Sequence, residues 1–387
     1  MGSLPRTRPG TLHETDPLHD EKASMRTQPA TLSWGALCAT ALLGLCAGHA
    51  HAGPRDTFAT TLVAAPPWGE HFFHGVALND SGAVVAYLQL PDDTYWYTGP
   101  DGQGLYYQPP QLGDAAATSL TDINDAGQIS GSYQSPTGQH AFITTADGTG
   151  FVDLHPAGAT MSAVLAVDEQ GRVAGEFSTD ARPFFLDGPG FRNDSQGDSY
   201  QQLGAAGVQV TPSALRNGVV VGYQKMADGH FHAFRTSRTG TKLNDLGTFG
   251  GSDSYAFGVN DAGVAVGYAT DAAGVRRAFI TQPDGSLRQL DTEGLFSSSV
   301  AYGIDAQGHV VGSGYLPAVG SIAFVTQKNG GRIFDLNKLT HMPQHRQLGS
   351  ANAINAKGQI LADDESDYGG PYLLTPATAA LAELDAR

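Results

Sequence analysis

Two histidines in this chain have a spacing that could serve metal binding. His230 and His232, in GHFHAF, are two positions apart. On a β-strand both side chains would point to one face, as two ligands of a Zn²⁺ site can. The sequence around them offers no third ligand, and His232 is part of a repeated element. We therefore keep metal binding at this pair as the minor alternative to a structural role.

The densest group of carboxylates lies near the C-terminus, in DDESDYGG. It contains Asp363, Asp364, Glu365 and Asp367, whose oxygens are of the type that Ca²⁺ prefers. The stretch does not follow the D-x-[DN]-x-[DN]-G spacing of a calcium loop. We therefore expect a solvated loop here, and another at NDSQGDS, residues 193–199.

A column of Asn and Asp recurs at near-constant spacing along the chain, with Arg216 as its exception. Its members are Asn79, Asn124, Asp168, Asn260, Asp305 and Asn355. Such a column could be mistaken for a ring of ligands. Each member, however, stands in a turn sequence such as N-D-A-G, where Asn or Asp hydrogen-bonds its own backbone two residues on. We expect the column to shape turns.

The phrase around these residues occurs seven times, and each unit holds four short apolar stretches. The turn glycines are Gly82, Gly127, Gly171, Gly218, Gly263, Gly308 and Gly358. An aromatic residue recurs in the third stretch, at Trp96, Phe142, Phe184, Phe234, Phe279, Phe324 and Tyr372. A leucine closes each unit, at Leu112, Leu154, Leu203, Leu246, Leu290, Leu336 and Leu384. The whole chain is therefore an internal repeat with a period of about 45 residues.

The stretches have the composition of β-strands. Runs such as VAVGY are rich in β-branched residues and too short for helices, and N-D-A-G joins two of them in a tight turn. Four strands in about 45 residues make one propeller blade, and seven such units make a ring. We predict an all-β fold, a seven-bladed β-propeller of four-stranded blades over residues 53–387. A β-solenoid would need dissimilar end caps, which we do not find, and a membrane barrel would need longer strands.

An additional stretch at the N-terminus, TFATTLVAAP, looks like a surplus copy of the fourth strand, because Leu62 precedes Leu112 by one repeat. We predict that this stretch pairs into the last blade and closes the ring, which would hide a sheet edge. The C-terminal tail LAELDAR, around Leu384, competes for the same place.

The repeated elements G-I-N-x-x-G-x-V-V-G, H-A-F and D-L-G-T-x-G-G resemble those of the bacterial extracellular HAF repeat family. They are carried most clearly by His140-Ala141-Phe142, His232-Ala233-Phe234 and the DLGTFGG of residues 245–251. The match covers nearly all of residues 58–387, and Pro183-Phe184 and Leu215-Arg216-Asn217-Gly218 depart from the pattern. The resemblance implies a secreted bacterial protein and brings no established reaction or site.

The N-terminal region contains the features of a secretory signal. Residues 34–48 form an apolar run of 15 residues, which is shorter than the roughly 20 that a membrane-spanning helix requires. Met25 and Arg26 precede it, and Ala50-His51-Ala52 gives a small-x-small cleavage pattern. We predict a signal peptide over residues 25–52, cleavage after Ala52, and a secreted chain without a membrane span.

We expect residues 1–24 to be an upstream extension, either disordered or the result of a wrongly assigned start codon. Two alternatives to a cleaved signal remain open for the apolar segment. LLGLC resembles a lipoprotein cleavage box, although bulky Leu45 precedes Cys46. An uncleaved anchor is the second alternative. Cys38 and Cys46, the two cysteines, both lie in the segment that signal cleavage would remove, which would leave no disulfide.

Charge and motifs limit the function. A formal net charge of -16 repels phosphate backbones and argues against nucleic acid as a partner. We find no nucleophile elbow, P-loop, zinc-protease helix or dinucleotide fingerprint after the signal. We predict a monomeric, non-catalytic binding module, without a cofactor, for an extracellular or periplasmic protein or glycan. The alternative is a carbohydrate-active hydrolase or lyase. Carboxylates or histidines converging in the propeller channel with shifted pKa values would favour it, and a lining of Ser, Thr and Ala would oppose it.

Overall fold

The computed structural model describes residues 57–65, 73–88, 94–107, 109, 112, 117–179, 188–291, 293–343, 346–364 and 370–387. All of them belong to one compact unit, Gly48–Arg387. The predicted upstream extension, residues 1–24, and the predicted signal peptide, residues 25–52, lie outside the described residues. Within the described part, no helix is long and apolar enough to cross a membrane.

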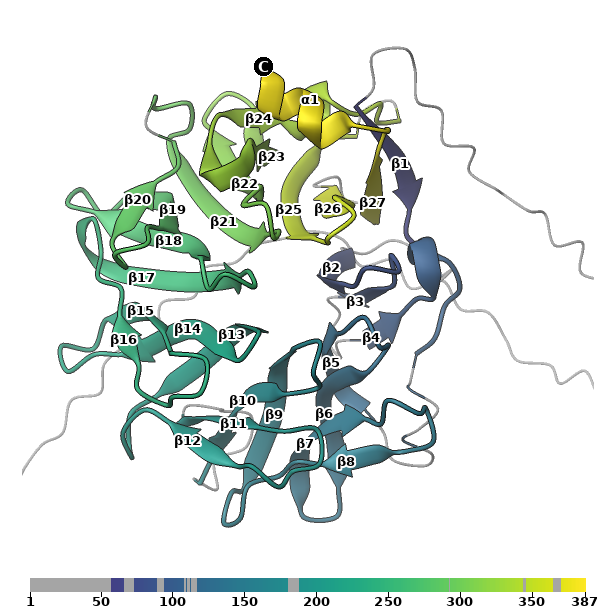
Figure 1. Cartoon of the computed structure of the whole chain (residues 1–387), viewed down its shortest axis with the longest axis vertical. Coiled ribbons are helices and arrows are strands. Elements are labelled where there is room, and N and C mark those ends of the chain that lie inside the picture. The colour runs from purple at the N-terminus through teal and green to yellow at the C-terminus, as the bar shows by residue number, and fades with distance from the viewer. Residues whose placement is uncertain are drawn as a thin grey trace, which may run out of the picture. The chain divides into compact units, whose positions relative to one another are not determined.

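Seven antiparallel sheets stand around a common centre, as Figure 1 shows. Blade 1 contains β2 (Phe73–Leu78), β3 (Val84–Leu88) and β4 (Thr94–Tyr97). Blade 2 contains β5 (Ala117–Ile123), β6 (Ile129–Ser135), β7 (Gly138–Thr144) and β8 (Phe151–Asp153). Blade 3 contains β9 (Met161–Val167), β10 (Val173–Ser178), β11 (Gly190–Asn193) and β12 (Gln201–Leu203). Blade 4 contains β13 (Val210–Arg216), β14 (Val219–Lys225), β15 (Phe231–Arg235) and β16 (Asn244–Asp245).

The remaining three blades complete the ring. Blade 5 contains β17 (Gly250–Val259), β18 (Ala265–Asp271), β19 (Arg276–Thr281) and β20 (Leu287–Gln289). Blade 6 contains β21 (Ser298–Ile304), β22 (Val310–Leu316), β23 (Gly320–Thr326) and β24 (Ile333–Asp335). Blade 7 contains β25 (Leu348–Ile354), β26 (Ile360–Asp364), β27 (Pro371–Pro376) and β1 (Phe58–Leu62). The helices are η1 (Pro100–Gly102), η3 (Lys328–Gly330), η4 (Leu336–Lys338) and α1 (Ala380–Ala386).

This architecture confirms the predicted seven-bladed propeller. Six blades have four strands among the described residues. In blade 1 the place next to β4 holds a single antiparallel bridge between Tyr97 and Tyr106. The short strands and the glycine turns of the repeat therefore form the elements that their composition indicates.

The predicted closure by the N-terminal strand is also confirmed. β1 pairs antiparallel with β27, from Phe58 opposite Pro376 to Leu62 opposite Tyr372. Phe58 is only 1% exposed and lies in the core between blades 6 and 7. The alignment of this stretch with the repeat depended on Leu62, but Leu62 is 54% exposed, so the buried anchor of β1 is Phe58. The competing C-terminal tail forms α1 instead. Leu384 lies on that helix, and its side chain is buried in the core between blades 6 and 7.

The aromatic column forms the centre of each blade. Phe142, Phe234, Phe279 and Phe324 are fully buried, and each lies opposite a glycine of the neighbouring strand. In blade 3 the prediction of Phe184 was wrong, because Phe191 lies opposite the matching glycine, Gly175, and is fully buried. Phe184 itself lies outside the described residues. The connection before β11 is longer than in other blades, so the nearest aromatic in sequence was not the correct one.

A β-bulge interrupts the pairing of the innermost strand in every blade. In blade 5, Ala256 lies opposite Gly267 and Gly258 lies opposite Val266, which leaves Phe257 as an extra residue. The bulge brings the carbonyl oxygen of Tyr255 against Gly267, where an added Cβ would lie only 1.9 Å from it. This close approach explains the glycine of the repeated V-V-G element. This bulge, next to the turn, places an unpaired residue at the same position of the innermost strand in all seven blades, and blades 2, 5 and 7 have a second register shift further from the turn.

Candidate functional site

The Asn and Asp column forms the turns on one side of the ring, which we call the turn face. Each side-chain oxygen accepts backbone hydrogen bonds from its own turn, as Asn79 Oδ1 does from Ser81 N and Ala83 N, both at 3.0 Å. The amide nitrogens donate to the next blade, from Asn79 to Asn124 O, Asn124 to Asp168 O, Asn260 to Asp305 O and Asn355 to Asn79 O. The predicted structural role is confirmed, and these bonds also join neighbouring blades.

Aspartate occupies the column where a basic residue follows four positions later. Arg172 Nε donates to Asp168 Oδ2 at 2.7 Å, and His309 Nδ1 lies 2.6 Å from Asp305 Oδ2. A carboxylate cannot donate to the next blade as an amide does. These two positions form an ion pair within the blade, and Asp168 Oδ2 also accepts from Gly218 N of blade 4 at 3.2 Å.

The second turn residue adds another set of bonds between blades. Asp80 Oδ1 accepts from Ala356 N at 2.7 Å, Asp125 Oδ1 from Asp80 N at 2.6 Å, and Glu169 Oε2 from Asp125 N at 2.8 Å. The hollow between these turns is a cavity of about 90 Å³. The polar groups of the turn face are therefore engaged in holding the ring together.

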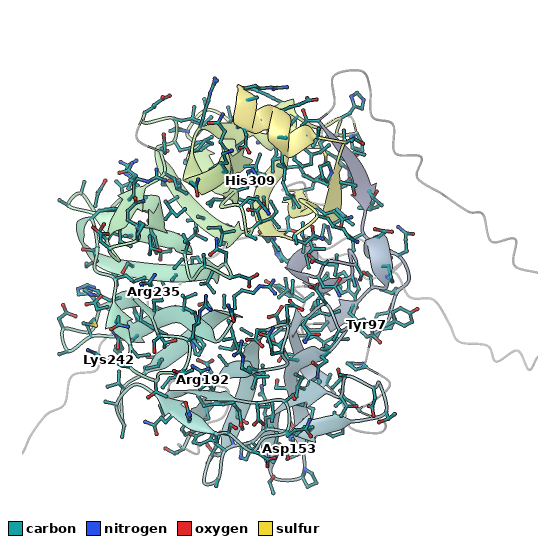
Figure 2. The ribbon with its side chains drawn as sticks, in the orientation of Figure 1. Tyr97, Asp153, Arg192, Arg235, Lys242 and His309 are labelled. Atoms are coloured by element: carbon teal, nitrogen blue, oxygen red, sulfur yellow. The ribbon has the colours of Figure 1, made fainter. Side chains whose placement is uncertain are left out.

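A buried histidine joins the turn face to the C-terminal helix. His309, labelled in Figure 2, is 3% exposed, and its Nε2 lies 3.4 Å from Asp385 Oδ1 of α1. The cation beside Asp385 is Lys328, with Nζ 3.8 Å from Oδ2. Burial alone would lower the pKa of His309, but its hydrogen bond to Asp305 and the charges of Asp305 and Asp385 raise that pKa above 6.5.

We expect His309 to stabilise the protein most at mildly acidic pH. Because its folded pKa lies above the unfolded value of 6.5, the contribution is fully present below pH 6.5 and is lost as the pH rises through the folded pKa. Denaturant unfolding of the wild type and of His309→Gln from about pH 5.5 to about pH 9 measures the difference in free energy of unfolding. A difference that does not shrink with rising pH would contradict a charged His309.

The two histidines singled out for metal binding bind different carboxylates. β15 begins at Phe231, so His230 precedes the strand, and its Nδ1 lies 3.3 Å from Asp253 Oδ2. His232 Nδ1 lies 2.9 Å from Asp245 Oδ2. Among the residues that the structure describes, no three His, Cys, Asp or Glu side chains form a group able to hold a metal ion.

The histidine of the H-A-F element has the same partner in two blades. His140 Nδ1 lies 2.8 Å from Asp153 Oδ2, as His232 lies beside Asp245. In both blades the carboxylate precedes the leucine that closes the unit. The H-A-F and D-L elements are therefore complementary parts of one blade, the third strand and the fourth.

The prediction of a solvated loop was wrong for the first two acidic residues of DDESDYGG. Asp363 and Asp364 end β26 and are each 6% exposed. Asp363 contacts Gly75 N at 2.9 Å, His74 Nδ1 at 3.2 Å and Asn352 Nδ2 at 2.8 Å. Arg346 Nη1 donates to Asp364 at 2.9 Å. Glu365 and Asp367 lie outside the described residues.

The second acidic stretch, residues 193–199, forms the turn between β11 and β12, as expected. Asp194 Oδ1 accepts hydrogen bonds from Gln196 N and Asp198 N, both at 3.0 Å. Its carboxylate oxygens are thus used within the turn.

The extra residues of the seven bulges all line one space at the centre of the ring, which we call the central cavity. It has a volume of about 150 Å³ and is lined by all seven innermost strands. The bulge residues are Val76, Thr121, Leu165, Ser213, Phe257, Tyr302 and Asn352. We did not predict these positions from the sequence. Each stands three residues before the turn residue, in a column whose side chains differ from blade to blade.

Two residues that break the repeat also line the central cavity. Asp122 stands where the other six units have Ala or Gly, and Arg216 replaces the turn Asn. Burial raises the pKa of Asp122 to about 6, although Val167 N and Ile123 N each donate to it at 2.9 Å. Burial also raises the pKa of Glu169, which pairs with Arg216. The lining is therefore more than Ser, Thr and Ala, and includes one carboxylate with a raised pKa, Asp122, whereas Glu169 lines the hollow of the turn face.

Six aromatic side chains form a continuous group that starts in the central cavity, and we call it the aromatic shelf. Its members are Tyr223, Phe231, Tyr255, Phe257, Tyr268 and Tyr302, from blades 4, 5 and 6. Tyr302 and Phe257 are 5.6 Å apart between ring centroids, Phe257 and Tyr268 are 5.9 Å apart, and Tyr255 and Tyr223 are 4.7 Å apart. All six are partly exposed.

The shelf extends away from the turn face. Tyr255 lies opposite Tyr268, beyond the bulge as seen from the turn. Arg276 begins β19 after the loop that joins β18 to β19, and its guanidinium lies 5.1 Å from the ring centre of Tyr268. We call the side that carries these loops between second and third strands the loop face.

Most polar groups of the shelf are free within the described structure, and the exception is the Tyr223 hydroxyl, which forms a hydrogen bond with Thr211. The hydroxyls of Tyr255, Tyr268 and Tyr302, and the guanidinium of Arg276, have no hydrogen-bond or ion-pair partner among the described residues. Burial raises the pKa of Tyr268 to about 12 and raises those of Tyr255 and Tyr302, so the phenols remain neutral O–H donors. The shelf therefore combines apolar rings with unused donors.

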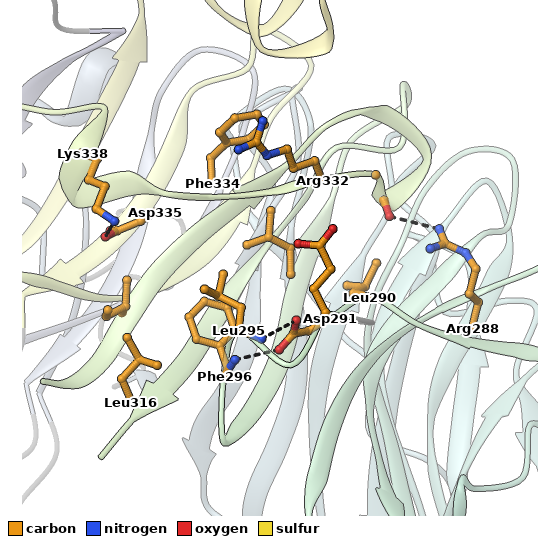
Figure 3. Close-up of a pocket in the computed structure, with 15 residues that line it drawn as sticks. Arg288, Leu290, Asp291, Leu295, Phe296, Leu316, Arg332, Phe334, Asp335 and Lys338 are labelled. Atoms are coloured by element: carbon orange, nitrogen blue, oxygen red, sulfur yellow. Dashed lines mark hydrogen bonds and ion pairs between the residues drawn. The ribbon is translucent and has the colours of Figure 1, made fainter. Parts of the chain in front are cut away.

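A larger hollow lies between blades 5 and 6, away from the centre (Figure 3). It is a cavity of about 600 Å³ with an apolar floor that includes Leu290, Phe296 and Leu316. Two of the bases on its rim are engaged. Arg288 donates to Asn329 O at 2.6 Å, and Lys338 Nζ lies 3.6 Å from Asp335 Oδ2. Arg332 lies over the ring of Phe334, as Arg276 lies over that of Tyr268. Its volume suits a small molecule, but the central site combines free donors with a row of aromatic rings.

Comparisons with known proteins support the fold. No protein-family model matches the sequence, and no curated protein is significantly similar to it. A prolyl endopeptidase structure is 9% identical, covers 77% of this chain and 47% of its own, and has a TM-score of 0.53. An acylaminoacyl peptidase from Pyrococcus horikoshii is 11% identical, with 79% and 52% covered and a TM-score of 0.49. An oligogalacturonate lyase in complex with manganese is 13% identical, with 84% and 97% covered and a TM-score of 0.49.

The chain corresponds to about half the length of these peptidases. At such low identity, the similarity to the prolyl endopeptidase structure shows the β-propeller fold alone.

Proposed function

We propose that this chain is a non-catalytic binding module built from HAF repeats, which acts after secretion through the signal peptide of residues 25–52. Its ligand is an extracellular or periplasmic protein or glycan, and it binds at the loop face. The observation that carries the proposal is the difference between the two ends of the central cavity. Hydrogen bonds between blades occupy the turn face, whereas the aromatic shelf leaves rings and donors unused.

Physical chemistry favours binding at such a surface. Aromatic rings that stay partly exposed cost free energy in water, and a cluster of them is typical of a binding surface. The shelf is also built on hydrogen-bonded strands of three blades, so a ligand would lose little affinity to reordering of the protein.

A thermal-shift screen of oligosaccharides, peptides and divalent cations tests this function. A ligand present at 100 times its Kd should add about 2.7 kcal/mol to the stability and raise the melting temperature. We expect Tyr302→Ala to abolish the shift and Asp125→Ala, on the turn face, to retain it. Mass spectrometry after prolonged incubation should detect the ligand with its mass unchanged, because a non-catalytic module does not convert its ligand. Ligands whose shifts survive Tyr302→Ala would contradict a site on the shelf.

The second candidate function is an enzyme acting on extracellular carbohydrate. The raised pKa values of Asp122 and Glu169 favour it, since one carboxylic acid and one carboxylate can serve as general acid and base. Against it, Asp122 accepts two backbone hydrogen bonds, and Glu169 binds Asp125 N and Arg216. Release of reducing ends from a polysaccharide, lost in Asp122→Asn, would establish the enzyme in place of the binding module.

A further inference from the structure

We propose that the aromatic shelf, together with Arg276 and Asn352, binds a carbohydrate chain of pyranose rings. This inference rests on the proposed binding function and names the ligand class. Three features of the described residues carry it: the ring surfaces, the unused donors and the balance of charge.

The ring surfaces suit the apolar side of a sugar. A pyranose ring presents C–H groups on its faces and hydroxyls around its edge, and the C–H groups pack on an aromatic ring whose face is electron-rich. The shelf offers such rings in a row from Tyr302 through Phe257 and Tyr255 to Phe231, with successive centroids 5.6, 6.4 and 5.9 Å apart. A row of this kind accommodates several consecutive sugar residues rather than a single one.

The unused donors suit the hydroxylated edge of a sugar. The hydroxyls of Tyr255, Tyr268 and Tyr302 are neutral and have no partner among the described residues, and each can donate to or accept from a sugar hydroxyl. Arg276 presents a fork of N–H donors that fits two neighbouring hydroxyl oxygens or the two oxygens of a uronate.

The blade 7 side of the central cavity contributes a fixed polar group. Asn352 is a bulge residue, and its Nδ2 donates to Gly75 O at 3.0 Å and to Asp363 Oδ2 at 2.8 Å. These bonds fix the amide, so its oxygen is a positioned acceptor in the cavity that Phe257 and Tyr302 also line. Asp363 also acts electrostatically on Tyr302, which places the two in the same neighbourhood.

The balance of charge disfavours charged peptides. The net charge of -16 opposes an acidic peptide at long range, and the unpaired Arg276 opposes a basic one on the shelf itself. An uncharged chain of hydroxylated rings meets neither penalty. A uronate chain meets the same long-range repulsion as an acidic peptide, which contact with Arg276 would offset at one carboxylate. The ligand class is therefore the pyranose chain, and the charge favours a neutral chain over a uronate.

A glycan array with neutral and uronate-containing oligosaccharides, probed with the full chain and followed by titration calorimetry, tests the inference. We expect binding to at least one pyranose hexamer, and an affinity about tenfold lower in Tyr268→Ala. Arg276→Gln, an exposed change that leaves the core intact, should also weaken binding. Tyr315→Ala alters an exposed ring outside the shelf and should bind as the wild type does. A loss confined to uronates in Arg276→Gln would assign Arg276 to the carboxylate, and a loss on neutral hexamers to hydroxyls.

The outcomes separate this inference from the function on which it rests. Absence of binding to every glycan, or binding that Tyr268→Ala and Arg276→Gln leave unchanged in folded protein, would overturn the carbohydrate inference. If a peptide or protein raises the melting temperature through Tyr302 while all glycans fail, the binding function stands and the ligand class is wrong. If no ligand of any class acts through the shelf, both are wrong.

Discussion

Replacing the five residues of β1, Phe58–Leu62, with glycine and serine in the full chain will abolish cooperative thermal unfolding. The change removes Phe58 from the core between blades 6 and 7 and leaves the edge of β27 unpaired. The ring would then be open at the joint where the first and last parts of the chain meet, and the exposed edge would promote aggregation. Calorimetry and light scattering during heating measure both effects.

A matched control lies on the same strand. Leu62→Ser changes an exposed side chain and keeps the pairing of β1 with β27, so its melting temperature should stay within about 2 °C of the wild type. Addition of a synthetic peptide of residues 56–64 should restore part of the cooperative transition to the replaced chain by strand addition. A replaced chain that melts cooperatively near the wild-type temperature would show that β1 does not close the ring.

Phe279→Ala should lower the free energy of unfolding by about 3–5 kcal/mol, the range for removal of a fully buried phenylalanine. A domain is usually stable by only about 5–15 kcal/mol, so this single change removes a large part of the total. Phe279 lies opposite Gly267, and no side chain there can fill the space that the ring leaves. Denaturant unfolding monitored by circular dichroism measures the loss.

Tyr315→Ala provides the comparison for Phe279→Ala. Tyr315 is 46% exposed on β22 of the next blade, so we expect a loss of no more than about 0.5 kcal/mol. Equal losses for the two variants would mean that the aromatic column does not form the blade cores.

The fold could be predicted because each repeat unit contains the turn and strand signals of one blade, and the number of units gives the number of blades. The turn chemistry of N-D-A-G and the length of each unit are visible in any one copy, and the period fixes the number of blades. The prediction that Phe184 is the core aromatic of blade 3 failed because the spacing of the repeat is not kept there. A longer connection before β11 shifted the register, and only strand pairing identifies Phe191 as the residue opposite Gly175.

The site could be predicted less well, because it depends on contacts between units. The bulge column was visible as the position three residues before the turn, but periodicity gave no reason to single out a variable position over constant ones. Tyr223, Tyr255 and Tyr302 come from three blades, and their contacts follow from the angle between sheets. Asp363 illustrates a different error, because the sequence drew attention to this residue but indicated the wrong environment for it. It appeared to belong to an acidic loop, yet its carboxylate is buried against Gly75 and Asn352.

The extra residue in each innermost strand faces the central cavity without taking part in strand pairing, whereas most residues of a β-sheet do both at once. A bulge residue lies outside the ladder of paired residues, so exchanging its side chain leaves the strand pairing of the blade unchanged. Seven such positions, one per blade, surround the central cavity, and their side chains vary from blade to blade. Randomising only these seven codons would give a library whose members share one scaffold and differ in what the centre recognises.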